Sequence, residues 1–231
     1  MTRSGHIYIT KGDDLFAVAD ALSRLPDAGE CCVSDCFESG FVADLCAAGF
    51  LVMSFRLDNG GVLLFPKYHN VRSALFFENL HIGRSVRRFL SRYELRFDED
   101  FDVIVDKCVE AYGGGWLTEP LLALIREIRR TAGSPVKPAA FGVYRNGELK
   151  AGEFGVIAGR VYTSYSGYHE ESSAGRVQMI LTARYLQQNG FGFWDLGMPL
   201  PYKYTLGAVD IDAQEWTKRF RSQTARQWLP G

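Results

Sequence analysis

The side chain best placed to do chemistry is Asp195, the one charge in the aromatic and apolar run from Phe191 to Leu196. A carboxylate at the end of a buried strand can hold an amine or accept its proton. The competing interpretation is that Asp195 caps the turn that follows, because Asp often hydrogen-bonds the backbone two residues further on. The residues alone leave both roles open.

A second candidate is a group of arginines at Arg84, Arg87, Arg88 and Arg92. On one continuous helix, Arg84, Arg88 and Arg92 would be four residues apart and would share a face. Guanidinium groups suit phosphate, because each can make a bidentate contact. The alternative is a solvated helix face, which is what charge runs usually form.

Glycines and a tryptophan follow one another in residues 112–116. Three consecutive glycines let the backbone approach a ligand closely, and Trp116 beside them could stack a base. A flexible turn next to a core tryptophan explains the same pattern equally well. Thr118 and Pro120 predict that a helix begins here, with the Thr118 hydroxyl as its cap.

The five cysteines predict no metal centre. Cys31, Cys32 and Cys36 are close enough to suggest one, but no second cluster of Cys or His follows at ligand spacing. Cys46 and Cys108 lie among apolar residues and are expected in the core. An odd number of cysteines cannot all pair within one chain, which fits a reducing compartment.

The composition is that of a protein with an ample core: 231 residues, 47% of them apolar, with a net charge of −1. A nucleic-acid partner would therefore have to meet a local basic patch. No apolar run reaches the roughly 20 residues of a membrane span, and no signal-peptide core follows the first residues. We expect a cytoplasmic protein without a membrane partner.

The elements that must position Asp195 lie between Ala139 and Ala208. The pattern predicts strands at Ala139–Tyr144, Leu149–Ile157, Val161–Tyr165 and Phe191–Leu196, with an Asn146-Gly147 hairpin and a helix that carries Val177 to Tyr185. Several strands, a crossover helix and a further strand are the outline of a GNAT-like (acyl-CoA N-acyltransferase-like) mixed-sheet domain.

The first 75 residues are expected to form a small N-terminal α+β domain, followed by the GNAT-like domain in residues 76–231. The elements predicted for the N-terminal domain are a strand at Ile7–Thr10, helices at Asp13–Leu25 and Phe41–Gly49, and a hairpin. The hairpin consists of Phe50–Phe55 and Val62–Phe65 around Asn59-Gly60-Gly61. Further along, Phe97–Ala111 is expected to bury Val103, Val105 and Cys108.

Four segments resemble, in order and spacing, motifs of the leucyl/phenylalanyl-tRNA-protein transferases. They are Leu80–Arg88, Trp116–Thr118, Leu149–Arg160 and Phe193–Ala208. The first is similar to the signature Leu-His-Ile/Val-Ser-Arg-Ser-Leu-Arg-Arg, and the second to a Trp-Ile-Thr that precedes a proline-started helix. The resemblance covers roughly Leu64 to Phe220.

This resemblance implies an aminoacyltransferase that needs no cofactor. Its partners would be an aminoacyl-tRNA and the N-terminus of an acceptor protein or peptide, which the reaction would tag as an N-degron. Trp116 would stack the terminal adenosine, and Arg84, Arg87, Arg88 and Arg92 would contact acceptor-stem phosphates. Asp195 would hold the acceptor amine.

The chain departs from the family at several site positions. Tyr165 replaces a reaction-centre Glu, Gly197 replaces a Gln, and Tyr202 stands where a His often follows the proline. Transfer from an activated ester needs mainly orientation and proton management, so Asp195 and Tyr165 remain the expected catalytic residues.

The aminoacyl pocket is expected at Glu153, Met179 and Thr182. Glu153 falls where the family has an apolar residue, and a buried carboxylate disfavours leucyl and phenylalanyl side chains unless it is paired. A lysyl, arginyl or strongly hydrogen-bonding side chain would satisfy it. If the strand slips by one residue, Glu153 faces solvent instead.

Two other classes of function remain open. A coenzyme A-dependent GNAT N-acyltransferase would bind phosphate at the start of the long helix, where residues 172–176 form a weak version of such a loop. A non-catalytic relative that binds tRNA or peptide would account for Tyr165 and Gly197. The sequence does not give the amino acid transferred, the acceptor or the oligomeric state.

Overall fold

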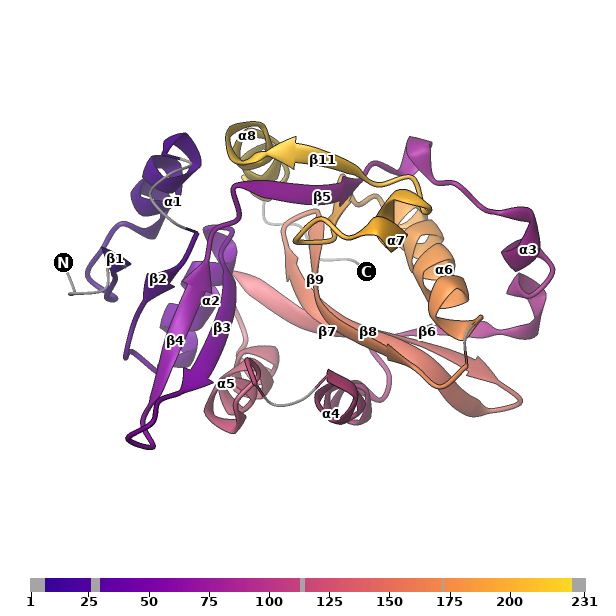
Figure 1. Ribbon diagram of the computed structural model, residues 1–231, viewed down its shortest axis with the longest axis horizontal. Coiled ribbons are helices and arrows are strands. Elements are labelled where there is room, and N and C mark those ends of the chain that lie inside the picture. The colour runs from indigo at the N-terminus through magenta and orange to yellow at the C-terminus, as the bar shows by residue number, and fades with distance from the viewer. Residues whose placement is uncertain (1–6, 26–29, 113–114, 172, 226–231) are drawn as a thin grey trace.

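The computed structural model describes residues 7–25, 30–112, 115–171 and 173–225 of a mixed α+β protein (Figure 1). The strands are β1 (Ile7–Tyr8), β2 (Cys32–Val33), β3 (Leu51–Arg56), β4 (Val62–Lys67), β5 (Val71–Leu75), β6 (Glu94–Phe97), β7 (Val136–Arg145), β8 (Glu148–Ala158), β9 (Val161–His169), β10 (Phe193–Asp195) and β11 (Val209–Asp212).

The α-helices are α1 (Leu15–Arg24), α2 (Ser39–Ala47), α3 (Arg84–Arg87), α4 (Phe101–Tyr112), α5 (Glu119–Arg130), α6 (Ala174–Gln188), α7 (Pro201–Tyr204) and α8 (Ala213–Thr224). Short 3₁₀ turns, η2 (Phe77–Asn79) and η3 (Leu90–Arg92), lie on either side of α3. No helix within the described ranges has the length and apolar character needed to cross a bilayer.

A seven-stranded sheet in the order β11-β5-β10-β9-β8-β7-β6 forms the centre of the molecule. Its pairs are antiparallel except β9 with β10, which are parallel and are joined by α6 as a crossover helix. The predicted Asn146-Gly147 turn joins β7 to β8, with φ of 54° and 82° at the two residues. Both angles are positive, as a type I′ hairpin turn requires.

The two faces of this sheet carry separate apolar cores. Helix α6 covers one face, where its Val177, Ile180 and Leu186 pack with Tyr162 and Trp194. Helices α2, α4, α5 and α8 cover the other face, where Phe154 belongs to the larger core. Because side chains alternate along a strand, neighbouring residues of β8, β9 and β10 enter different cores.

Strands β9 and β10 separate soon after they meet. Their pairing covers only Val161–Thr163 against Phe193–Asp195, whereas β9 continues to His169 paired with β8 alone. The register of β8 with β9 also shifts between Phe154 and Gly155. Asp195 therefore lies at the last paired position before the two strands diverge.

The N-terminal part of the chain forms two small sheets, a parallel pair β1–β2 and an antiparallel pair β3–β4. Strand β5, which ends at Leu75, pairs with β10 and β11 and so belongs to the central sheet. Figure 1 shows the small sheets at one end of the molecule and α3 at the other.

Three local expectations were wrong. The arginine segment is not one continuous helix, because α3 ends at Arg87 and a 3₁₀ turn carries Arg92. In α4 the buried residues are Phe101, Ile104, Val105 and Cys108, and Val103 is 48% exposed. Thr118 precedes α5, but its hydroxyl makes no cap; it pairs with the Ser54 hydroxyl at 2.8 Å instead.

Candidate functional site

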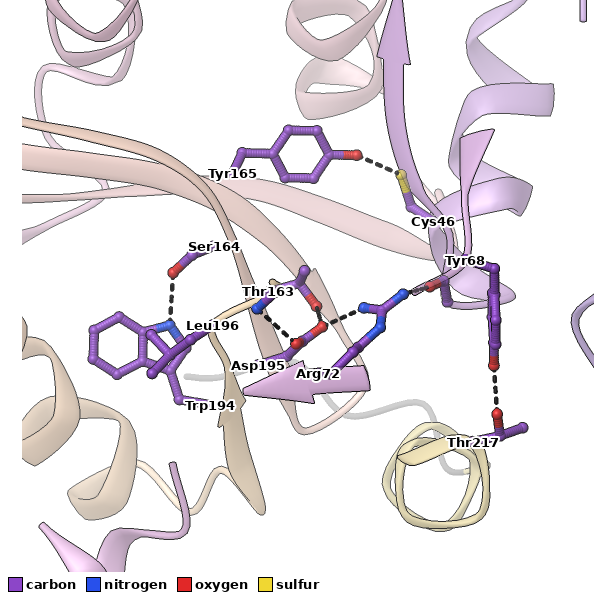
Figure 2. Close-up of polar contacts among 12 residues, drawn as sticks. Cys46, Tyr68, Arg72, Thr163, Ser164, Tyr165, Trp194, Asp195, Leu196 and Thr217 are labelled. Atoms are coloured by element: carbon purple, nitrogen blue, oxygen red, sulfur yellow. Dashed lines mark hydrogen bonds and ion pairs between the residues drawn. The ribbon is translucent and has the colours of Figure 1, made fainter. Parts of the chain in front are cut away.

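Asp195 is completely buried at the end of β10 and is bonded on both carboxylate oxygens (Figure 2). Arg72 Nη1 donates to Oδ2 at 2.6 Å, and the Thr163 hydroxyl donates to the same oxygen at 3.1 Å. The backbone N–H of Gly197 donates to Oδ1 at 3.0 Å. Asp195 thus both caps the following turn, through the Gly197 N–H, and forms an ion pair with Arg72.

Arg72, on β5, is the cation that neutralises Asp195. It is 1% exposed, and its Nη2 donates to the carbonyl of Gly49 at 2.5 Å. Its guanidinium lies 3.8 Å from the ring centroid of Trp216 in α8. One side chain therefore ties β5, β10, the end of α2 and α8 together.

Tyr165 lies on the same face, with its hydroxyl directed at α2 and β3 (Figure 2). The hydroxyl oxygen accepts from the Val52 N–H at 3.1 Å and lies 3.4 Å from the Cys46 Sγ. Burial raises the pKa of Tyr165 well above its usual value, so the hydroxyl keeps its proton. A cavity of about 10 Å³ beside Thr163 and Tyr165 has room for no more than one water.

Glu153 lies on the opposite face, under α6, and is only 6% exposed. The indole N–H of Trp194 donates to Ser164 Oγ at 2.8 Å, and Ser164 in turn donates to Glu153 Oε2 at 3.2 Å. Burial raises the pKa of Glu153 to about 8, although Ser164 and Gln178 act to lower it. The strand has not slipped, and the solvent-facing alternative is wrong.

Helix α6 supplies the other two residues expected at the aminoacyl pocket. Thr182 is fully buried and accepts from the Gln178 amide at 2.9 Å. Met179 is partly buried and packs on the same apolar core. Glu153, Gln178 and Thr182 thus form one polar group beneath α6.

Lys203 lies on α7, and its side chain contacts the loop that follows β10. It is 4% exposed, and its Nζ donates to the carbonyls of Leu196 and Met198 at 2.5 and 2.7 Å. Burial lowers the pKa of Lys203 to about 8, while Asp195 and Glu153 act to raise it. The charge of Lys203 therefore interacts with both buried carboxyl groups.

Arg84, Arg87, Arg88 and Arg92 are all exposed around α3. None of them makes an ion pair or a side-chain hydrogen bond to another described residue. Arg88 and Arg92 lie 4.8 and 5.1 Å from the ring centroid of Phe89. The four guanidinium groups, here called the arginine patch, are available to a ligand.

Trp116 is not near the arginine patch. Its carbonyl accepts from the Ser54 N–H of β3 at 2.9 Å, and its ring centroid is 6.2 Å from that of Tyr165. In Figure 1, α3 lies at the right-hand end of the long axis and β3 lies in the left half. Gly113 and Gly114, in the glycine run before Trp116, lie outside the described residues, as does Ser172 of the proposed phosphate loop.

The cysteines are all free. Burial raises the pKa of Cys32 and Cys108 to about 12 and that of Cys46 to about 11. Across the described ranges, no three His, Cys, Asp or Glu side chains gather in a way that could bind a metal ion.

The sequence interpretation missed Arg72, Lys203 and Gln178. Arg72 is a lone cation in the otherwise uncharged run Val71–Leu75, as Asp195 is a lone anion in its own strand. Two isolated opposite charges on buried strands are a pairing signal, since each would be costly alone. No comparable signal marks Gln178, whose neighbours in α6 are ordinary for a helix.

The chain matches known proteins over most of this region. The family described as leucyl/phenylalanyl-tRNA protein transferase matches residues 74–221. Among curated relatives, the leucyl/phenylalanyl-tRNA–protein transferase of Pseudomonas entomophila is 31% identical over 63% of this chain and 65% of its own length. That of Pseudomonas putida is 32% identical over 61% and 62%. These alignments span a little under two thirds of either relative.

Among solved structures, FemX has a TM-score of 0.45 and 10% sequence identity, over 92% of this chain and 80% of its own.

Proposed function

Because this chain belongs to the leucyl/phenylalanyl-tRNA protein transferase family, we propose that it moves an aminoacyl group from a charged tRNA to the N-terminal amine of an acceptor protein. Such a transfer would tag the acceptor as an N-degron and would take place in the cytoplasm. The family match, residues 74–221, includes both Glu153 and Asp195, the two buried carboxyl groups.

The observation that supports the reaction most is the placement of Asp195 where β9 and β10 separate. Its carboxylate accepts three hydrogen bonds from Arg72, Thr163 and Gly197, and a carboxylate can accept about four. One acceptor position is thus unused, and an incoming amine would have to enter the buried surroundings of Asp195 to reach it. Asp195 would orient that amine and assist its deprotonation.

We assign tRNA binding to the arginine patch. Its four exposed guanidinium groups have no anionic partner among the described residues, so phosphates can meet them without breaking an existing ion pair. Trp116 remains our candidate for stacking the terminal adenosine, at a separate position near Tyr165. An acceptor end that reaches both would have to pass over the central sheet.

We place the aminoacyl pocket at Glu153, Met179 and Thr182, and propose that it disfavours leucyl and phenylalanyl side chains. Glu153 puts a buried carboxyl group where the pocket would otherwise be apolar. An aliphatic or aromatic side chain offers that carboxyl group no hydrogen bond.

We interpret the central sheet with its crossover helix α6 as GNAT-like, and we divide the chain into domains at residues 1–75 and 76–231. In this division β5 is the strand by which the first domain enters the sheet of the second.

A non-catalytic relative is the second candidate, and the environment of Tyr165 favours it. The Tyr165 hydroxyl is engaged by Val52 and Cys46, and Asp195 is paired with Arg72, so both groups already have structural partners. A coenzyme A-dependent enzyme has less support. Glu171, three residues before α6, carries a carboxylate that Arg145 holds at 2.6 Å, and a negative charge beside the loop disfavours a phosphate there.

One experiment separates these functions. The protein is incubated with a mixture of charged tRNAs and with peptides of varied N-terminal residue, and the products are identified by mass. We expect peptides extended by one residue, and loss of that product in Asp195→Asn with tRNA affinity nearly unchanged. tRNA binding without any extended peptide would favour the non-catalytic relative.

The arginine patch has its own test. Arg84→Glu and Arg88→Glu should each weaken tRNA binding, and more at low salt than at high salt, because phosphate contacts release counterions. Arg130→Glu, an exposed arginine at the end of α5, is the matched control. Trp116→Ala should cost roughly 1–3 kcal/mol of binding if the ring stacks a base.

A further inference from the structure

Two buried oxygen atoms under α6 have no hydrogen-bond partner among the described residues: Glu153 Oε1 and Tyr162 Oη. The Gln178 amide and the Tyr162 hydroxyl lie near enough to lower the pKa of Glu153 as weak hydrogen-bond donors, yet neither reaches the geometry of a full hydrogen bond to Oε1. Buried polar atoms are rarely left in this state, because they lose their bonds to water and gain none. A bound group that offers hydrogen bonds would complete the cluster.

The backbones around Glu153 approach one another closely. Gly167 faces it on β9, and a Cβ there would lie 3.1 Å from the Cβ of Glu153. Gly152, before it on β8, is equally close to the side chain of Ile104. Glycines at both positions let the strands close tightly, and the Ser164 hydrogen bond holds the carboxyl group under α6.

The charges around Glu153 decide what kind of group fits. With its pKa raised to about 8, Glu153 is mostly protonated at neutral pH and can donate as well as accept. Lys203 is the nearby charge that acts on Glu153, and it is mostly cationic under the same conditions. A cationic ligand would have to ionise this buried acid and would also face the positive charge of Lys203, which is unfavourable.

A carboxamide is the complement of this arrangement. Its carbonyl accepts from a protonated carboxyl group while its N–H donates to the other carboxyl oxygen, so the two planar groups form a pair of hydrogen bonds. The Tyr162 hydroxyl can bond the remaining amide position. A hydrocarbon side chain would leave all of these groups unsatisfied.

We propose that the cluster of Glu153, Tyr162, Gln178 and Thr182 selects an aminoacyl side chain with an uncharged hydrogen-bonding end, foremost the carboxamide of glutamine or asparagine. This inference rests on the proposed aminoacyl transfer and names its substrate class. It narrows the sequence expectation, which included lysyl and arginyl side chains.

Direct binding tests it without requiring turnover. The probes are adenosines that carry a glutaminyl, leucyl or lysyl group on a 3′ amide, which cannot transfer. We expect the glutaminyl probe to bind at least about tenfold more tightly than the other two, because a site built on buried hydrogen-bonding groups rejects ligands that lack them. Glu153→Met should abolish or reverse the preference over leucyl, and Glu153→Gln should retain it. Glu110→Met, at an exposed carboxylate on α4, should change nothing.

Three outcomes would overturn the inference: equal binding of the three probes, preference for leucyl or lysyl, or no binding of any. The charged-tRNA mixture then separates the two proposals. Transfer of leucine by the wild type at the same rate as glutamine leaves the reaction standing and removes the selectivity. Selective binding of the glutaminyl probe without any transfer removes the reaction and leaves the selectivity. Thermal unfolding of Glu153→Met verifies that the variant is folded.

Discussion

Asp195 and Glu153 are buried carboxyl groups on opposite faces of one sheet, and their surroundings differ in kind. Asp195 has a cation at 2.6 Å and two further donors, which together satisfy most of its bonding capacity. Glu153 has one side-chain donor at 3.2 Å and an oxygen with no partner among the described residues. Lys203 acts on both groups and is bonded to carbonyls of the loop after β10.

The difference indicates how the two groups are used. A carboxylate with a buried counterion and several donors is fixed in charge and position, as an orienting group should be. A protonated carboxyl group that makes few hydrogen bonds can form new ones with a ligand without first breaking strong existing ones. The Asp195 face therefore suits orientation of a reacting amine, and the Glu153 face suits recognition.

The largest effect on stability is expected from removing the cation that pairs with Asp195. Arg72→Met leaves a buried carboxylate without its cation and also removes the Gly49 contact, so we expect the free energy of unfolding to fall by about 3–5 kcal/mol. The double variant Arg72→Met, Asp195→Leu should recover part of that loss, because no charge is left unpaired. Urea unfolding measures both, and a loss below about 1 kcal/mol for the single variant would contradict the assignment of Arg72 as the partner.

The next expected effect is a dependence of stability on pH, which arises from Glu153 and the nearby Lys203. The pKa of Glu153 rises from 4.5 in the unfolded chain to about 8, so the folded state binds the proton more strongly and stability falls as pH rises through that window. The pKa of Lys203 falls from 10.5 to about 8, so the unfolded state binds more protons and stability rises as pH increases from 8 to 10.5. The contribution of the two groups to stability is thus lowest near pH 8.

Other buried groups titrate in the same range, so the two contributions are measured as differences from variants. The stability of the wild type minus that of Glu153→Gln should decrease between pH 5 and 8. The same difference for Lys203→Met should increase between pH 8 and 10.5. Differences that do not vary with pH would show that neither group is buried as the structure has it.

A smaller effect is expected at Ser164, which links Trp194 to Glu153. Ser164→Ala removes the acceptor of the buried indole N–H and the donor to Glu153 Oε2, and leaving such groups unpaired costs about 1–3 kcal/mol. Ser166→Ala is the matched control on the same strand. Equal stability of the two variants would show that the link carries no free energy.

The central elements could be predicted because their signals are local. The Asn146-Gly147 turn requires positive φ at two residues, and the helical spacing from Val177 to Tyr185 falls within α6. Placing Glu153 inward was less certain from sequence, since a strand that is buried on both faces shows no alternation of apolar and polar residues.

The remaining site could not be predicted, because it depends on contacts between distant segments. Arg72 and Asp195 are 123 residues apart, and although each is the lone charge of its strand, neither strand shows which distant charge its partner is. The arginine row was expected to be one helix from its spacing of four, but α3 ends after Arg87. The two errors differ in cause: a spacing of four residues is compatible with a helix without requiring one, and periodicity carries no information on tertiary partners.

The smallest effect separates a structural role from a catalytic role at Tyr165. Its hydroxyl accepts from the Val52 N–H and lies beside the Cys46 sulfur, while its ring packs near Phe154 and Trp116. Tyr165→Phe keeps the ring and removes only the hydroxyl, so the free energy of unfolding should fall by about 1 kcal/mol. Because the raised pKa of Tyr165 keeps the hydroxyl protonated at neutral pH, it cannot act as a base, and the rate of transfer should change less than about threefold. A loss of transfer of a hundredfold or more with unchanged stability would instead place the Tyr165 hydroxyl in the reaction centre, and the contrast between the two faces would then have to include a catalytic donor beside Asp195.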